Sequence, residues 1–210
     1  MPDGRDAPGD GAETAGAQAA AFDPTSVWRG DLGLTDLIDQ RDVPKSEPRF
    51  EVLGALDEAS SALGLVRAGP ASATTKEVVL SVQRDLCWMM SEVASVAEDG
   101  RRPSQINAER LEYLAVEFAR LTAAAPLGNA FVVPGDTQAS AALQLARAIV
   151  RRAERQVTQL ARGDGLPNPN ILPYLNRLSA LLYALARAED AGSGVASTIA
   201  HPPGRQGGGL

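Results

Sequence analysis

Apolar residues recur through the middle of the chain at spacings of three and four positions, the period of an α-helix with one buried face. Alternation at every second position, which would indicate half-buried strands, is nearly absent. Proline, glycine and capping residues divide this region into helices that we predict over about 48–68, 72–98, 103–125, 136–163 and 170–190. The pattern therefore predicts an all-α chain with five helices.

The last two predicted helices carry narrow apolar seams. These seams consist of Leu143, Ala146, Val150, Ala153, Val157 and Leu160 in one helix and Leu175, Leu178, Leu182 and Leu185 in the other. Narrow seams of this kind suit helices that pack nearly parallel to their neighbours, so we expect an up-and-down bundle. Residues 1–24 and 192–210 have little to bury, which predicts disordered tails around one bundle domain at 25–191.

Composition excludes several classes of function. The 20 Lys and Arg against 26 Asp and Glu give a net charge of −6, which argues against binding to nucleic acid or an anionic membrane. The single histidine, His201, and the single cysteine, Cys87, argue against histidine chemistry and cysteine-rich metal sites. Cys87 falls in an apolar stretch, so we expect it to be buried. We find no signal-peptide pattern or membrane-spanning run and expect a cytoplasmic protein.

A cationic row accompanies the first seam. Arg147, Arg151 and Glu154 each follow a seam residue by one position, and Asn176, Ser179 and Tyr183 do the same in the last helix. Rows beside the seams should converge where the two helices meet, which would form an anion site. The alternative is a solvated helix face in which Glu154 pairs with the arginines along one helix.

The stretch "RGDLGLT" at 29–35 is a second candidate for binding an anion. Its two glycines and the following hydroxyl can expose backbone N–H groups to a phosphate, although such a stretch also occurs as a plain turn.

Several stretches closely resemble the PduO-type ATP:cob(I)alamin adenosyltransferases. "ARAIVRRAERQV" (146–157) and "YLNRLSALLYALAR" (174–187) are similar to the two signature helices of that family. "RGDLGLTDL" (29–37) with Lys45 resembles its N-terminal nucleotide loop, "GALDEASSALGL" (54–65) its first helix, and "AFVVPG" (130–135) the loop before its fourth helix. The resemblance covers about residues 29–190.

The resemblance implies a function and a set of site residues. The implied enzyme is a homotrimer with active sites between subunits, and it moves the 5′-deoxyadenosyl group of ATP, bound with Mg²⁺, to Co(I) of cobalamin. A reductase and a cobalamin-dependent mutase are its possible partners. The implied catalytic residues are Arg147, Arg151, Glu154 (also at the metal) and Asp57, which would pair with Arg147. The implied binding residues are Gly30, Asp31, Gly33, Thr35, Lys45, Arg152, Asn176, Tyr183 and Phe131, the last displacing the lower axial ligand of the corrinoid.

The chain departs from the family pattern mainly at the nucleotide loop. The positions that differ are Val27, Trp28, Arg29, Leu32, Asp39, Gln40 and, on the last helix, Ala180. Hydroxyl and cationic groups that would bind phosphate are thereby lost, and Asp36 and Asp39 add negative charge nearby. Two further hypotheses follow: a corrinoid carrier without ATP chemistry, and a different enzyme that uses the same cleft.

Overall fold

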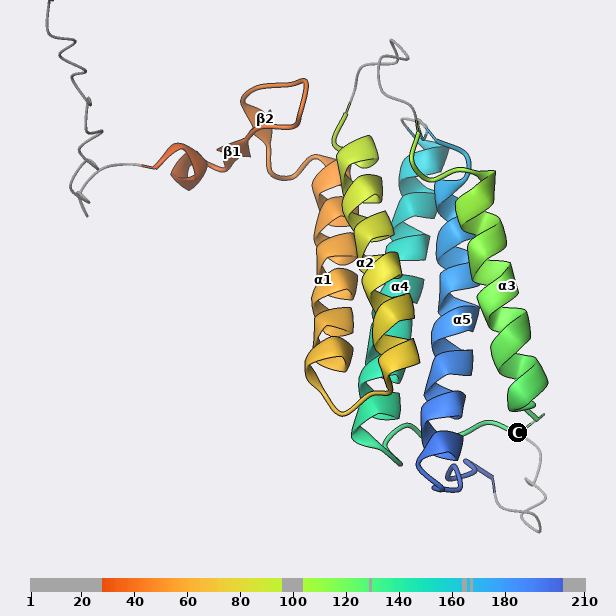
Figure 1. Ribbon diagram of the computed structural model, residues 1–210. Coiled ribbons are helices and arrows are strands. Elements are labelled where there is room, and N and C mark those ends of the chain that lie inside the picture. Colours follow the sequence, from red (N-terminus) through yellow and green to blue (C-terminus); the bar gives the residue numbers. More distant parts are fainter. Residues whose placement is uncertain (1–27, 96–103, 129, 164–165, 167, 202–210) are drawn as a thin grey trace, which may run out of the picture.

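The computed structural model describes residues 28–95, 104–128, 130–163, 166 and 168–201. Within these residues, an up-and-down bundle of five α-helices follows a short N-terminal hairpin (Figure 1). The elements are η1 (a 3-10 helix, Arg29–Leu32), β1 (Leu34–Thr35), β2 (Val43–Pro44), α1 (Pro48–Ala68), α2 (Ala73–Val93), α3 (Ala108–Ala124), α4 (Gln138–Arg162) and α5 (Ile171–Gly192). The all-α prediction is confirmed.

The two predicted seams form the centre of the core. Helix α4 packs against α1 on one side and α5 on the other, while α2 covers α1 and α3 covers α5. Every seam residue of α4 and α5 is at most 4% exposed, so these helices bury the apolar stripe that the spacing predicted. Helices α4 and α5 run antiparallel: a hydrogen bond of 3.0 Å joins Thr137, before α4, to Asp190 near the end of α5. Helices α3 and α5 run parallel, because Arg177 near the start of α5 donates to the carbonyl of Leu111 near the start of α3.

Side-chain caps explain where the helix boundaries differ from the prediction. Helix α3 begins at Ala108 rather than near residue 103, because the Asn107 side chain accepts the Arg110 N–H at 3.1 Å. Helix α4, predicted from about residue 136, begins at Gln138 because Thr137 caps it and exchanges hydrogen bonds with Ser140.

Helix α2 is shorter than predicted at its C-terminal end. It stops at Val93, and the carbonyl of the next residue, Ala94, accepts the backbone N–H of Ile38 at 3.1 Å. The adjacent Ser95 hydroxyl donates to the carboxylate of Asp39. The loop between β1 and β2 is thus attached to the end of α2, and residues 96–98 of the predicted helix lie outside the described residues.

A buried polar network joins α2, α3 and α5. The carboxylate of Asp85 accepts from Arg110 Nε at 2.9 Å and Nη2 at 2.5 Å, and from the Tyr174 hydroxyl at 2.6 Å. Burial raises the pKa of Tyr174 well above its ordinary value, and the Asp85 charge acts in the same direction. Tyr174 therefore stays a neutral donor, and the three helices share one satisfied acceptor.

Two predictions about individual segments differ from the structure. Cys87 is exposed rather than buried, because α2 packs mainly on α1 and leaves its Cys87 and Trp88 face uncovered. Residues 193–201, which we expected to be disordered, include a β-bridge between Ile199 and Val132. The remaining tail residues, 1–24 and 202–210, lie outside the described part of the chain. Among the described helices, none is long and apolar enough to cross a membrane.

Candidate active site

The polar rows of α4 and α5 meet where these helices pack together. The guanidinium carbon of Arg147 lies over the Tyr183 ring, 5.5 Å from its centre. Both side chains are half-buried, so this cation–π contact is partly shielded from water. The expected convergence of the rows occurs at this contact. Asn176, at the other end of the α5 row, is exposed.

The remaining charged groups of α4 have different environments. Arg151 is exposed and Glu154 is half-buried, and neither forms an ion pair with another described residue. The alternative of pairing along the helix is therefore wrong for Arg147, Arg151 and Glu154. Arg152 instead forms an ion pair with Glu58 of α1. The row thus presents guanidinium groups whose charge is not neutralised within the described chain.

The implied pair between Asp57 and Arg147 is absent from the described chain. Asp57 is exposed on α1, and two other carboxylates of α1 contact α4: Glu58 pairs with Arg152, and Glu51 accepts from Gln156 at 3.5 Å. Arg147 instead contacts Tyr183 of α5, on the side of α4 that faces away from α1. The pair is not formed within the described chain, and between subunits it stays a prediction.

The N-terminal loop is closed by Lys45. Its ammonium group donates to the carbonyl of Gly30 at 2.8 Å, and its backbone N–H donates to the carbonyl of Gly33 at 2.8 Å. Gly33 has φ of 74°, a conformation that favours glycine, and Thr35 pairs with Val43 in the hairpin. Asp31 accepts the Trp28 N–H at 2.8 Å, so its carboxylate stabilises the turn. Lys45 is therefore held at the loop by backbone carbonyls rather than by a carboxylate.

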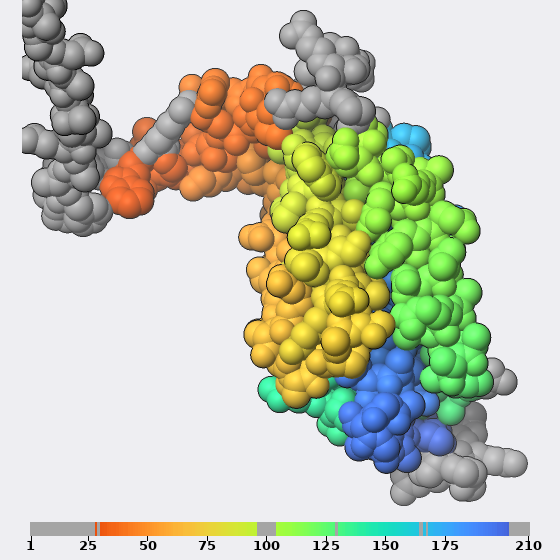
Figure 2. All heavy atoms as spheres, in the orientation of Figure 1, coloured from red at the N-terminus to blue at the C-terminus, as the bar shows by residue number. Residues whose placement is uncertain are grey.

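The carboxylates near this loop are engaged elsewhere. Asp36 accepts from Arg41 at 2.6 Å, which offsets its charge, and Asp39 accepts from Ser95. The expected repulsion of an anion is thus weakened. Two of the positions that differ from the family pattern present apolar side chains at the loop surface: Trp28 is 60% exposed and Leu32 is 76% exposed. In Figure 2 this N-terminal segment projects from the bundle.

Phe131 lies on a loop that the C-terminal segment holds in place. Its side chain is 81% exposed, and its carbonyl accepts the N–H of Ala200 at 2.8 Å. The backbone of Val133 bonds to Thr198, whose N–H and hydroxyl also donate to Asp136 at 2.8 and 2.6 Å. No sequence pattern indicates this pairing, because the two segments form only an isolated β-bridge, Val132 with Ile199, and lie far apart in the chain. The loop presents an apolar ring to the outside.

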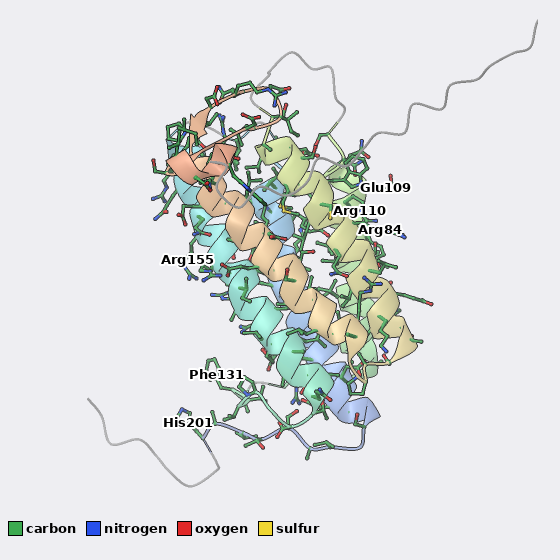
Figure 3. All side chains as sticks on the ribbon, turned by 90° about the vertical axis from the view of Figure 1, so that its left-hand side faces the viewer. Arg84, Glu109, Arg110, Phe131, Arg155 and His201 are labelled. Atoms are coloured by element: carbon green, nitrogen blue, oxygen red, sulfur yellow. The ribbon has the colours of Figure 1, made fainter. Side chains whose placement is uncertain are left out.

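One chain does not bring the two predicted ligand-binding loops together. Figure 3 shows Phe131 and His201 at one end of the bundle, while the hairpin with Lys45 lies at the other end. The 25 residues of α4 separate these ends, which is roughly 37 Å at 1.5 Å per residue. Among the described residues there is also no group of three or more His, Cys, Asp or Glu side chains that could hold a metal ion.

The fold and this set of residues define a class: an all-α bundle with an outward-facing arginine row and two separate loops suited to binding ligands. Residues 26–189 match the family model of cobalamin adenosyltransferases. The chain belongs to the cobalamin adenosyltransferase family.

Relatives and solved structures agree with this assignment. The chain is 36% identical over 174 residues to the corrinoid adenosyltransferase PduO of Salmonella typhimurium, covering 81% of this chain and 51% of the relative. It is 34% identical to the corrinoid adenosyltransferase of Bacillus subtilis, covering 79% and 86%. A variant of the PduO-type ATP:corrinoid adenosyltransferase of Lactobacillus reuteri, complexed with cobalamin and ATP, superposes with a TM-score of 0.76 at 28% identity, covering 81% and 96%. The chain spans about half the length of the Salmonella relative.

Proposed function

We propose that the protein transfers the 5′-deoxyadenosyl group of ATP to the Co(I) ion of a corrinoid and releases triphosphate. The observation that carries this proposal is the guanidinium row of α4, in which Arg147 and Arg151 have no carboxylate partner among the described residues. Triphosphate carries several negative charges, and guanidinium groups bind such oxygens with fixed geometry and permanent charge. Family membership and the apolar Phe131 loop support the corrinoid as the second substrate.

The proposed reaction forms a cobalt–carbon bond and breaks the C5′–O bond of ATP. The cobalt electron pair forms the new bond, and triphosphate leaves with the electrons of the broken one. Arg147, Arg151 and Lys45 would stabilise the charge on the leaving group, which is the main catalytic requirement of such a step. Mg²⁺ would be bound chiefly by phosphate oxygens, and the unpaired Glu154 is the carboxylate suited to it.

We further propose a cytoplasmic homotrimer in which each site lies between two subunits. The hairpin and the Phe131 loop are at opposite ends of one bundle, so a loop from a neighbouring subunit must approach the arginine row. A reductase would supply Co(I), and a cobalamin-dependent mutase would use the adenosylated product.

The test of the function is direct. The protein is incubated with MgATP and chemically reduced cobalamin, and adenosylcobalamin and triphosphate are quantified. Formation of both in equal amounts is the expected result. Binding of cobalamin with neither product would instead favour the corrinoid carrier, a second candidate that the exposed Trp28 and Leu32 of the nucleotide loop support.

Subunit complementation tests the shared site. Lys45→Met and Arg151→Met should each abolish most activity when expressed alone. If the hairpin of one subunit serves the arginine row of the next, randomly mixed trimers keep about a quarter of their sites intact. Co-expressed variants should therefore recover up to about a quarter of wild-type activity. No recovery, with trimers shown by light scattering, would place both residues in a site within one chain.

Replacing Phe131 with alanine should lower the rate of adenosylation about tenfold or more at saturating ATP, because an apolar wall no longer excludes water and axial ligands from cobalt. The melting temperature should stay unchanged, because the 81% exposed ring contributes little to the core. Steady-state kinetics and thermal denaturation measure the two effects. Leu65→Ala, on an exposed α1 residue, is the control and should affect neither. Unchanged kinetics of the Phe131 variant would exclude it from the corrinoid site.

A further inference from the structure

Arg187 on α5 is a guanidinium whose donors are not satisfied by the protein. It follows Tyr183 by one helical turn and so continues the polar row of α5. Its Nε and Nη1 atoms are buried, and neither has a hydrogen-bond partner among the described residues. Buried donors of this kind are rare in native proteins, and each needs a physical explanation such as an acceptor supplied by a ligand or by water.

The nearest explanation, a bond to Asp136, does not hold. Both carboxylate oxygens of Asp136 accept hydrogen bonds from Thr198, at 2.8 Å from its N–H and 2.6 Å from its hydroxyl. These bonds lower the pKa of Asp136, and the charge of Arg187 contributes further in the same direction. Asp136 is therefore ionised and attracts Arg187 at a distance, but the buried Nε and Nη1 donors of Arg187 have no acceptor among the described residues.

The position of Arg187 relates it to the corrinoid side of the proposed site. Along the α4–α5 contact, Tyr183 lies beside Arg147, and Asp190 is bonded to Thr137 at the start of α4. Arg187 lies between Tyr183 and Asp190 along α5, and the loop that carries Phe131 leads into α4 at Thr137, beside Asp190. Arg187 is hence located between the Arg147–Tyr183 contact and that loop.

We propose that the Nε and Nη1 groups of Arg187 bind acceptor oxygens of the corrinoid, and that this contact orients the ring against Phe131. The inference rests on the proposed function. A guanidinium only donates hydrogen bonds, and its two adjacent N–H groups suit one or two oxygen acceptors. Corrinoids offer two sources: the amide carbonyls around the ring and the phosphate of the lower nucleotide. Neither the arginines of α4 nor Lys45 is needed for this contact.

The experiment compares wild type with Arg187→Met and, as a control, Arg177→Met. Arg177 lies on the same helix but donates to the carbonyl of Leu111 at 3.0 Å, so its substitution should leave the corrinoid KM unchanged. Arg187→Met should raise the KM for cobalamin about 10- to 100-fold, as expected for a lost hydrogen bond to a charged group. The KM for ATP should change by less than about twofold. The melting temperature should not fall, because methionine replaces unsatisfied buried donors with an apolar chain.

Cobinamide, which lacks the nucleotide and its phosphate, distinguishes the two sources. Equal increases in KM for cobalamin and cobinamide would identify the ring amides, and an increase for cobalamin alone would identify the phosphate. Unchanged KM values for both corrinoids would overturn the inference while leaving the proposed function intact. A fall in melting temperature with a parallel rise in the KM for ATP would assign Arg187 a structural role instead. Wild-type protein that binds neither corrinoid would remove the proposed function, and this inference with it.

Discussion

Replacing Asp85 with alanine is expected to lower the free energy of unfolding by about 3–5 kcal/mol, the usual cost of removing one partner from a buried ion pair. Asp85 is the shared acceptor of Arg110 and Tyr174, at distances of 2.5 to 3.0 Å. Its side chain is 8% exposed and that of Arg110 is 25% exposed, so water cannot fully replace the lost carboxylate. The variant leaves a cation and a hydroxyl without their acceptor, and it loosens the contact between α2, α3 and α5.

Urea denaturation of wild type, Asp85→Ala and Arg110→Met measures this effect. The matched control is Glu109→Ala, which removes an exposed carboxylate from the first turn of α3 (Figure 3). Loss of its interaction with the helix dipole should cost less than about 1 kcal/mol. The double variant should be less destabilised than the sum of the single variants, because the two residues share one interaction. A loss below about 1 kcal/mol for Asp85→Ala would show that the network contributes little to stability.

Asp85 also shows why the sequence predicts some parts of this molecule and not others. The helices and their seams follow from local spacing, because the period of 3.6 residues is repeated in the apolar positions of α4 and α5. The partners of Asp85 lie 25 and 89 residues away in the chain, and no local pattern connects them. In the sequence Asp85 stands next to Arg84 before an apolar stretch, and nothing marks it as buried.

The exposed Cys87 has a related cause. Its surroundings in the sequence are apolar, but burial depends on whether a second helix covers that face of α2. Similarly, the pairing of residues 198–200 with the Phe131 loop depends on tertiary contacts between two segments without strand periodicity. Local composition cannot specify such contacts.

One contact between the two polar rows, in contrast, follows from the sequence pattern. Arg147 and Tyr183 each follow their seam by one position, and this offset alone placed them near the boundary of the two helices, where they meet. The offset does not predict that Glu58 forms an ion pair with Arg152, or that Asp57 forms none with Arg147 in the described chain. Those outcomes depend on side chains of α1, whose rotation relative to α4 is not encoded in the α4 pattern.

Replacing Arg151 with methionine is expected to lower kcat/KM for adenosylation by about 10²- to 10³-fold, the usual effect of removing one preorganised charge from a transition state. Arg151 is exposed and has no ion pair among the described residues, so its guanidinium contributes little to the fold of the single chain. The variant should therefore keep the wild-type melting temperature and helix content. Stability and activity are separated here because the arginine has no role within its own bundle.

The control is Arg84→Met, which removes an exposed arginine from α2. Figure 3 shows Arg84 well apart from Arg155, which follows Arg151 by one turn on α4. It alters the net charge by the same amount, so a general electrostatic effect on ATP would appear in both variants. Arg151→Met alone should raise the Kd for MgATP in calorimetric titrations and slow the chemical step in single-turnover assays. Equal activity of the two variants would assign the α4 row to a solvated helix face. A loss confined to Arg151→Met would instead support a contact between the row and ATP, since no described carboxylate of its own chain pairs with that guanidinium.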